Sequence, residues 1–403
     1  MPALSFKDWT KLRILDGELT SVLERLENEA LLRRVRIIRS AHGAEVESGG
    51  RRMLMLSSNN YLDLAAHPAV KRAAIEAVER YGVGAAASRL VAGSLEPVHR
   101  LEQSLARFKG VESALVFGSG YLANMGAITA LAGPGDVIFS DELNHASLID
   151  GCRLSRATVR VFRHRDIDHL KVLLEDTTGS GRRLIVTDSV FSMDGDLAPL
   201  ADIVGLAREF RAAVMIDEAH GVGVIGPGGA GLAAELGLGN EIDVQVGTLS
   251  KALGAQGAYV AGSRTLTDFL INRARCFIYT TGLAPALAAA AEAALRVMIN
   301  EPARIARLHD NAAYLCAALI AAGFQLAPTA SSILPVMIGS AQNALMMAER
   351  LFARGVYVIA IRPPTVPQGS ARLRVTPTAG HTRSDLDRAI AAFIESGREL
   401  RVI

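Results

Sequence analysis

The sequence predicts an α/β fold in which a mostly parallel central sheet is covered by helices and is followed by a smaller α+β domain. Short, continuously apolar segments alternate with longer helical segments through the middle of the chain, a pattern typical of buried parallel strands. The chain has 403 residues, 50% of them hydrophobic, which is enough for a large core. We expect an N-terminal helix and strand segment over residues 1–55, a large domain over 56–290 and a small domain over 291–403.

The N-terminal region predicts two helices separated by a strand. Residues 16–38, DGELTSVLERLENEALLRRVRII, place leucines at helical spacing with charges between them and predict an amphipathic helix. The segment RRMLMLSSNNYLDL (51–64) predicts a strand that ends in a polar turn. The next segment, HPAVKRAAIEAVERYG (67–82), predicts a helix that Gly82 closes.

Seven apolar runs predict the strands of the central sheet. In chain order they are ALVFGS, DVIFSD, TVRVFRH, RLIVTDSV, AVMIDEAH, DVQVGTL and GAYVAGS, and helical runs such as PLADIVGLAREFRA separate them. In open parallel sheets, ligands bind outside the carboxyl ends of the strands. We therefore expect the functional residues directly after these runs.

The C-terminal part of the chain predicts the small domain. An alanine-rich helix over residues 284–300 is followed by a further helix, the strand candidates ILPVMIG, YVIAI and RLRVT, and a last helix from about Ser384. Residues 311–348 contain no charged side chain, but Gly323 and Pro328 divide them into a helix-length and a strand-length piece. We therefore expect a buried helix and a buried strand there rather than a membrane span.

Charge and cysteine content narrow the classes of function. The 43 basic and 41 acidic residues give a net charge of +2, which provides no basic field for nucleic acid, so we expect small-molecule chemistry. Three widely separated cysteines, Cys152, Cys276 and Cys316, suggest neither a disulfide framework nor a metal cluster. The N-terminus, MPALSFKDWTKLRILDGEL, has no apolar core of signal-peptide length. We expect a cytoplasmic enzyme with no metal and no membrane partner.

Polar residues lie directly after five of the predicted strands. They are Ser119, Tyr121, Asp141, His145, Asp188, Ser192, Asp217, His220, Thr248 and Lys251. Each alone fits an ordinary helix cap or turn. Asp217 is more informative, because it ends an apolar strand where a carboxylate is costly without a cationic partner. For Asp217 and His220, a structural network and a cofactor contact both remain open.

Lys251 is the residue that most suggests catalysis. The chain has only six lysines, and this one lies in VGTLSKALGAQGAY among residues with small side chains. In a desolvated site the pKa of the amine falls, and the neutral amine becomes a nucleophile able to form a Schiff base. The alternative is a surface lysine whose stem packs on apolar groups. A G-x-G-x-x-G pattern in HGVGVIGPGG does not indicate a dinucleotide site, because Pro-Gly-Gly follows and no helix begins there.

The strand-end residues include a lysine amine, an acid for a ring nitrogen and donors for a phosphate, which together meet the needs of pyridoxal phosphate. The stretches DELNHASLIDGCRLSRA, DSVFSMDGDLAPL, IDEAHGVGVIGPGGAG and GTLSKALG closely resemble the signature segments of the α-oxoamine synthases. Members of this family are acyltransferases of PLP-dependent fold type I. The resemblance runs from about Leu19 to the C-terminal helix. It implies pyridoxal 5'-phosphate as cofactor and a homodimer with shared active sites.

The resemblance also implies which residues hold the cofactor. Lys251 matches the Schiff-base lysine and general base, Asp217 the partner of the ring nitrogen, and His145 the imidazole stacked on the ring. Further cofactor contacts are implied for Gly120, Tyr121, Ser192, His220, Thr248 and, from the neighbouring subunit, Thr281. His145 and His220 are both candidates for the hydrogen bond that assists decarboxylation.

The substrates implied by the resemblance are an amino acid and an acyl thioester. Asn59 and Arg374 match the substrate-side groups, with Arg374 gripping the amino-acid carboxylate, while Thr365 and Arg33 match positions that touch the acyl substrate. The segment IRPPTVPQGSARLRVT resembles members that condense L-alanine with a pimeloyl thioester carried on coenzyme A or on a carrier protein. A sibling that takes glycine, serine or another acyl chain stays open, as does a non-enzymatic relative of the fold.

Two departures from the family pattern bear on the acyl substrate. Asp63 stands where the family usually has glycine, so the turn after this strand differs if the position needs a positive φ. Residues 85–87, three alanines, replace a run richer in glycine and serine near the acyl entrance of the relatives.

Overall fold

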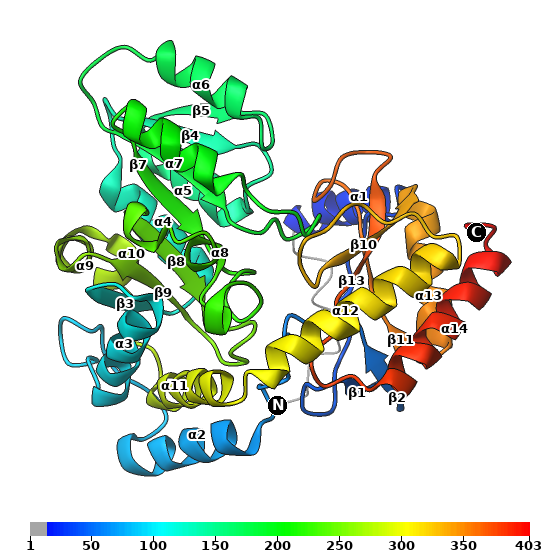
Figure 1. The fold of residues 1–403 in the computed structure, drawn as a ribbon. Helices are drawn as coiled ribbons and strands as arrows, with labels where there is room; N and C mark the ends of the chain where they lie inside the picture. The colour runs from blue at the N-terminus through cyan, green and yellow to red at the C-terminus, as the bar shows by residue number, and fades with distance from the viewer. Residues whose placement is uncertain (1–13) are drawn as a thin grey trace.

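The structure, a computed structural model, describes residues 14–403. It consists of a large body and a smaller body, connected by the long helix α12 (Ala303–Ala321) (Figure 1). Residues 1–13 lie outside the described residues. They include the start of the predicted N-terminal segment (1–55) and most of residues 1–19, on which the expectation of no signal peptide rests.

The large body is built on a seven-stranded sheet. Its strands are β3 Ser113–Phe117, β4 Val137–Asp141, β5 Thr158–Phe162, β6 Arg183–Asp188, β7 Ala213–Asp217, β8 Val244–Thr248 and β9 Ala258–Gly262. The strand order is β3-β9-β8-β7-β6-β4-β5. β9 runs antiparallel to both of its neighbours, while the neighbouring pairs from β8 to β5 are parallel. The seven predicted strands and the mostly parallel sheet are therefore confirmed.

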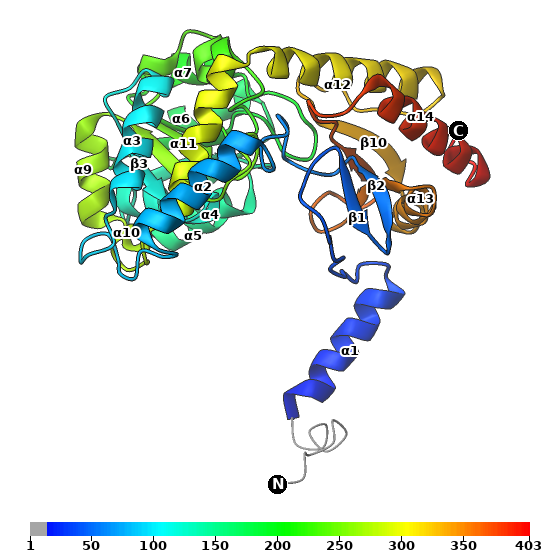
Figure 2. The same cartoon turned by 90° about the horizontal axis from the view of Figure 1, so that it is seen from below.

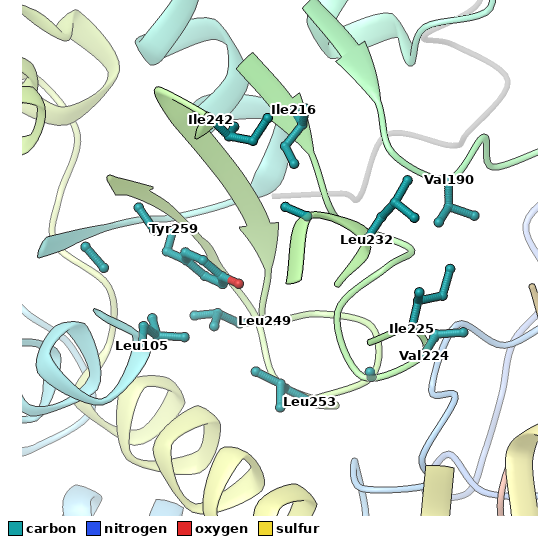
Figure 3. Close-up of a cluster of buried hydrophobic side chains, with 14 of the residues drawn as sticks. Leu105, Val190, Ile216, Val224, Ile225, Leu232, Ile242, Leu249, Leu253 and Tyr259 are labelled. Carbon is teal, nitrogen blue, oxygen red and sulfur yellow. The ribbon is translucent and has the colours of Figure 1, made fainter. Parts of the chain in front are cut away.

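Helices cover both faces of this sheet. They are α2 Pro68–Tyr81, α3 Glu96–Lys109, α4 Gly120–Leu131, α5 Ala146–Ser155, α6 Ile167–Glu175, α7 Leu200–Glu209, α8 Leu232–Glu235, α9 Arg264–Arg273, α10 Arg275–Ile278 and α11 Pro285–Asn300. Because side chains alternate along a strand, neighbouring residues of β7 belong to different cores. Ile216 lies in the core that contains residues of α3, α7 and α11, whereas Met215 lies in the core that contains residues of α4, α5 and α9. Figure 3 shows part of the first core, in which Leu105, Leu249 and Tyr259 lie together.

The smaller body contains two three-stranded sheets and an apolar core of its own. Its elements are β1 Glu45–Ser48, β2 Arg51–Met55, β10 Leu334–Gly339, α13 Ala341–Ala353, β11 Val356–Tyr357, β12 Ile359–Ile361, β13 Ala371–Val375 and α14 Arg383–Glu399. The sheet orders are β10-β13-β12 and β1-β2-β11. The predicted strand YVIAI is thus divided, because β11 pairs with β2 and β12 pairs with β13. The domain boundaries after residues 55 and 290 stay a prediction.

The N-terminal helix is shorter than its sequence pattern predicts. α1 spans Ile14–Asn28, so the predicted continuation to residue 38 is wrong. Ala30 has a φ of +57°, a left-handed conformation that does not continue a helix. Leu19 and Leu23 are 48% and 52% exposed, and Figure 2 shows α1 extending away from the two bodies. The predicted apolar face exists, but no other segment within residues 14–403 covers it.

The uncharged stretch between residues 311 and 348 folds as a helix and a strand, as predicted. The helix is the second half of α12 and the strand is β10, and α13 begins near the end of the stretch at Ala341. Across residues 14–403, no helix combines the length and the apolar character that crossing a membrane requires.

The two departures from the family pattern keep left-handed backbone conformations. Asp63 and Ala86 both have a φ of +57°. Asp63 tolerates this conformation better than most residues because a short polar side chain bonds locally, and its Oδ1 accepts from the Asn60 side chain at 3.3 Å. The turn after β2 therefore keeps a positive φ without glycine.

Candidate active site

The carboxyl ends of three neighbouring strands bring predicted residues together. Asp188 ends β6 and Asp217 ends β7, and the two lie opposite each other in the register of the sheet. Thr248 ends β8, and Lys251 follows it by three residues. These residues therefore occupy the edge at which open parallel sheets bind their ligands.

The amine of Lys251 lies inside the protein, 2.9 Å from Nε2 of His220. Burial lowers the pKa of this amine from 10.5 to about 8, although the negative charges of Asp217 and Asp188 oppose the shift. The positive charge of Arg374 lowers the pKa further. A lysine with this pKa is partly neutral near pH 7 and is able to act as a nucleophile or a proton acceptor. The surface-lysine alternative does not fit this position.

His220 connects Lys251 to a buried tyrosine. Its Nδ1 lies 2.6 Å from the hydroxyl of Tyr61. Burial, followed by the positive charges of Lys251 and Arg374, holds the pKa of His220 well below its usual value, so the ring is neutral. A neutral imidazole has one N–H donor and one acceptor. It therefore links the lysine amine and the tyrosine hydroxyl in one hydrogen-bonded chain.

Arg374 of β13 joins this chain from the smaller body. Its Nη2 donates to the Tyr61 hydroxyl at 3.2 Å. Its Nη1 donates to Oδ1 of Asn59 at 3.0 Å, and its Nε donates to the Ser192 carbonyl at 2.5 Å. A guanidinium has five N–H donors, so one remains on each terminal nitrogen. Two such donors are what bidentate recognition of a carboxylate requires.

Asp217 is a buried carboxylate, 5% exposed, with no cation at ion-pair distance among residues 14–403. Its Oδ2 accepts from the Asn124 side chain at 2.7 Å, and its Oδ1 accepts from the Ala219 amide at 2.8 Å. Each carboxylate oxygen has two lone pairs, so acceptor capacity remains. A protonated nitrogen of a ligand would satisfy both this capacity and the negative charge.

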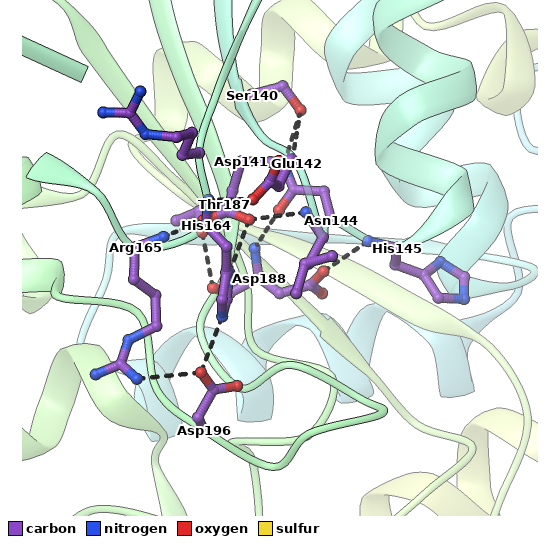
Figure 4. A network of polar contacts seen from close by, with 12 residues as sticks. Ser140, Asp141, Glu142, Asn144, His145, His164, Arg165, Thr187, Asp188 and Asp196 are labelled. Carbon is purple, nitrogen blue, oxygen red and sulfur yellow. Dashed lines mark hydrogen bonds and ion pairs between the residues drawn. The ribbon is translucent and has the colours of Figure 1, made fainter. Parts of the chain in front are cut away.

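His145 precedes α5 beside the two aspartates. Its backbone N–H donates to Oδ2 of Asp188 at 2.7 Å, as Figure 4 shows, and its ring Nδ1 lies 2.7 Å from Oγ of Ser147. Burial lowers the pKa of the His145 ring, and the charge of Asp217 opposes the shift. Burial and the charge of Asp217 raise the pKa of Asp188 well above its usual value. The aspartate pair therefore favours a single negative charge.

The start of α4 and the end of β8 offer donors for an anion. Ser119 caps α4 with its side chain, and Gly120 and Tyr121 form the first turn of the helix. N–H groups in a first turn have no partner within the helix and attract negative charge. Oγ1 of Thr248 lies 2.7 Å from Oγ of Ser250. A helix N-terminus of this kind is a common phosphate site.

Three predicted residues lie outside this cluster. Thr281 is exposed, and its backbone pairs with Ser88 in an isolated bridge. Arg33 and Thr365 are both exposed and meet at 3.4 Å between Nη2 and Oγ1. The structure thus joins the two residues assigned to the acyl substrate, but within residues 14–403 no hydrogen bond connects them to Lys251.

Comparison with known proteins places the chain in a family. A family model described as aminotransferase class I and II matches residues 51–393. The chain belongs to this family. The match extends from β2 to α14 and includes the predicted cofactor residues from Gly120 to Thr281.

Two curated relatives cover nearly the whole chain. The 8-amino-7-oxononanoate synthase of Geobacter sulfurreducens is 51% identical over 393 residues, which is 97% of this chain and 100% of the relative. The protein of that name from Anaeromyxobacter dehalogenans is 50% identical over 92% of this chain and 93% of its own length. The predicted relationship to the α-oxoamine synthases is confirmed.

Solved structures show the same fold. A serine palmitoyltransferase from S. paucimobilis with bound PLP has a TM-score of 0.92 and 32% identity, and the match covers 97% of this chain and 100% of the other. The 8-amino-7-oxononanoate synthase of Francisella tularensis has a TM-score of 0.73 and 27% identity over 87% of this chain and 99% of the other. The predicted PLP-dependent fold type I architecture is confirmed.

Sequence reasoning did not identify Tyr61 and Asn124. Tyr61 is 0% exposed, and the available signal was a tyrosine inside the polar turn SSNNYLDL, since a buried tyrosine hydroxyl needs a partner. Asn124 is the single amide in the otherwise apolar helix GYLANMGAITAL. A buried amide in such a helix must be hydrogen-bonded, and here it serves Asp217.

A separate hollow of about 1130 Å³ lies at the opposite end of the sheet. Its lining includes Arg183, Phe210 and Asp243, at or shortly before the amino ends of β6, β7 and β8, together with Phe269 of α9. None of the predicted site residues lines it. We therefore assign the chemistry to the strand ends around Lys251, where the perturbed pKa values and the polar groups converge.

Proposed function

We propose that this chain is an 8-amino-7-oxononanoate synthase of biotin synthesis. In this reaction a pyridoxal-phosphate-dependent acyltransferase condenses L-alanine with a pimeloyl thioester and releases carbon dioxide and the free thiol. The observation that carries the proposal is the 51% identity over 97% of the chain to a relative of that name.

The buried groups around Lys251 fit pyridoxal 5'-phosphate. The lowered pKa of Lys251 suits the capture of an aldehyde, and the spare acceptor capacity of Asp217 suits a protonated ring nitrogen. The amides of Gly120 and Tyr121, with the hydroxyl of Thr248, would hold the phosphate. When bound, the cofactor supplies an electron sink for the negative charge that develops at Cα of the amino acid.

Further contacts to the cofactor are proposed for three residues around this cluster. His145 would lie against the ring, His220 would contact its phenolic oxygen, and Ser192 would bond a polar atom of the cofactor. His145 and His220 each have a lowered pKa, so both rings are neutral and can donate one hydrogen bond while accepting another. Either imidazole can therefore assist decarboxylation by a hydrogen bond.

The chain's own residues bind the amino acid and move its proton. Arg374 would hold the alanine carboxylate with its two remaining terminal donors, while Asn59 and Tyr61 fix the plane of the guanidinium. Lys251 would accept the Cα proton at Nζ, because its pKa of about 8 leaves part of the amine neutral. Neutral His220, 2.9 Å away, would then accept a hydrogen bond from the resulting ammonium ion.

The acyl thioester and the second subunit would complete the site. We propose that Arg33 and Thr365, which meet at 3.4 Å, contact the pimeloyl thioester. The uncovered leucine face of α1 supports a homodimer. Thr281 supports it as well, because a residue that contacts the cofactor of the neighbouring subunit must be exposed on its own subunit, and Thr281 is exposed. We also propose a cytoplasmic location, supported by three cysteines that are all free.

A sibling reaction is the second candidate. The serine palmitoyltransferase structure has a TM-score of 0.92, against 0.73 for the 8-amino-7-oxononanoate synthase. The fold therefore does not separate the two activities. The sequence identity of 51% to one synthase against 32% to the transferase favours the former.

The test is an assay of the purified holoenzyme with L-alanine, glycine and L-serine, each against pimeloyl, acetyl and palmitoyl thioesters. Mass detection of the amino ketone identifies the product directly. We expect L-alanine with pimeloyl-CoA or a pimeloyl-carrier protein to give the highest kcat/KM. Faster reaction of glycine with a short acyl group, or of serine with palmitoyl-CoA, would contradict the proposal.

A further inference from the structure

His164 lies outside the cluster around Lys251, yet both nitrogens of its ring contact carboxylates. Nδ1 lies 3.0 Å from Oδ1 of Asp141, and Nε2 lies 2.9 Å from Oδ2 of Asp196, contacts that Figure 4 draws as dashed lines. Asp141 is the last residue of β4, whereas Asp196 follows β6. The ring also meets the Phe191 ring edge-on, with centroids 4.4 Å apart. One side chain thus joins two segments that are far apart in the sequence.

These two contacts require a charged imidazole. Carboxylates only accept hydrogen bonds and a neutral imidazole has one N–H, so only the imidazolium form satisfies both. Burial alone would lower the pKa of His164, but the hydrogen bonds and charges of Asp141 and Asp196 outweigh it and raise the pKa to about 9. Two other charged groups are close: Glu142 accepts from the His164 amide at 2.8 Å, and Arg165 donates to Asp196 at 3.1 Å.

The segment that His164 holds, residues 191–196, is also bound by the smaller body. We call this segment the 191–196 loop. Arg372 of β13 forms an ion pair with Asp194 in the loop. Arg374, two positions further and therefore on the same face of the strand, donates to the Ser192 carbonyl at 2.5 Å. The loop thus connects His164 in the large body to the arginine that would hold the amino acid.

We propose that His164 is a positioning residue for the amino-acid site, because it ties Asp196 to Asp141 and so fixes the loop whose Ser192 carbonyl holds the guanidinium of Arg374. His164 acts through the loop, since its ring contacts belong to Asp141, Asp196 and Phe191. The inference rests on the proposed function for the identity of the ligand at Arg374. The placement of the loop is independent of that assignment.

The test compares the wild-type holoenzyme with His164→Gln and with a matched control, His42→Gln. A glutamine amide donates from one nitrogen only and carries no charge, so it cannot replace the double contact. His42 is exposed and has no side-chain hydrogen bond among residues 14–403. We expect the Kd for L-alanine, titrated by the absorbance change of the bound cofactor, to rise about tenfold in His164→Gln, because misplaced binding groups are costly. The Kd for L-alanine and the Kd for the cofactor should both stay unchanged in His42→Gln.

Hydrogen exchange supplies a readout that needs no substrate. The Phe191 amide bonds to the Asp196 carbonyl at 3.0 Å, and the Gly195 amide bonds to the Phe191 carbonyl at 2.8 Å. Both amides should exchange faster in His164→Gln and at the wild-type rate in His42→Gln. Equal exchange in the wild type and His164→Gln would overturn the inference. A wild-type holoenzyme that binds no amino acid would instead contradict the proposed function, while the exchange rates still decide on His164.

A second variant and a pH series distinguish loss of the His164–Asp196 contact from general unfolding of the variant. Asp196→Asn removes the charged partner of the His164–Asp196 contact from the other side. The double variant should lose less alanine affinity than the sum of the two single variants, because both substitutions remove this shared contact. In the wild type the contacts of His164 with Asp141 and Asp196 weaken as pH rises through the His164 pKa of about 9 and the ring loses its proton. The Kd for L-alanine should therefore rise more steeply above that pH in the wild type than in His164→Gln. Additive losses in the double variant would overturn the inference.

Discussion

Replacing Tyr61 by phenylalanine tests the hydrogen-bonded chain that connects Lys251 to Arg374. The substitution removes one hydroxyl from a side chain that is 0% exposed and leaves the ring in place. The hydroxyl bonds to His220 at 2.6 Å and accepts from Arg374 at 3.2 Å. Loss of a hydrogen bond to a charged group costs about 1.5–3 kcal/mol. If this loss falls on the transition state, kcat/KM for L-alanine drops about 10- to 150-fold.

The assay is the steady-state rate of amino ketone formation at several alanine concentrations, with Tyr259→Phe as the matched control. Tyr259, labelled in Figure 3, is also 0% exposed, but its buried hydroxyl has no hydrogen-bond partner among residues 14–403. Removing an unpaired buried hydroxyl relieves a cost of about 1–3 kcal/mol, so the control should keep its activity and melt at the same or a higher temperature. A Tyr61→Phe variant with the kcat/KM of the wild type would refute the proposed role of the hydrogen-bonded chain between Lys251 and Arg374.

Three further predictions concern Lys251 and Arg374, the residues at the two ends of the hydrogen-bonded chain. Lys251→Ala should abolish turnover and the visible absorption of the lysine-bound cofactor, and a variant that keeps both would contradict the assignment of Lys251. Capture of pyridoxal phosphate by the cofactor-free protein should accelerate with rising pH and level off above about 8, because only the neutral amine of Lys251 attacks; stopped-flow absorbance measures the rate, and a rate that keeps rising up to about pH 10 would contradict the lowered pKa. Arg374→Lys should raise KM for L-alanine about 10- to 100-fold, since a lysine cannot reproduce the bidentate fork; an unchanged KM would place the carboxylate elsewhere.

The strands and the residues at their ends were predictable because both depend on local sequence. Continuous apolar runs identify buried parallel strands, and a charged residue such as Asp217 at the end of such a run needs a special explanation. Tyr61 was not predictable in the same way. Its partners His220 and Arg374 lie 159 and 313 positions away in the sequence, and no local pattern reports a contact of that range.

The end of the first helix shows another limit of sequence patterns. Leucine spacing indicates a face that needs covering, but not which segment covers it or where the helix stops. Ala30 adopts a left-handed conformation, although alanine is among the strongest helix formers. The division of YVIAI between two sheets has a similar cause, because the pairing partners β2 and β13 come from opposite ends of the chain. Pairing with distant strands therefore decided how YVIAI divides.

The influence of Arg374 on the pKa of Lys251 makes substrate binding and proton binding thermodynamically linked. The positive charge of Arg374 is one of the causes that lower the pKa of Lys251. A carboxylate bound to the guanidinium would neutralise that charge, so Lys251 would hold a proton more tightly when the amino acid is present. By reciprocity, a proton on Lys251 would strengthen carboxylate binding by the same factor. The substrate would thus increase the basicity of the group that takes its proton.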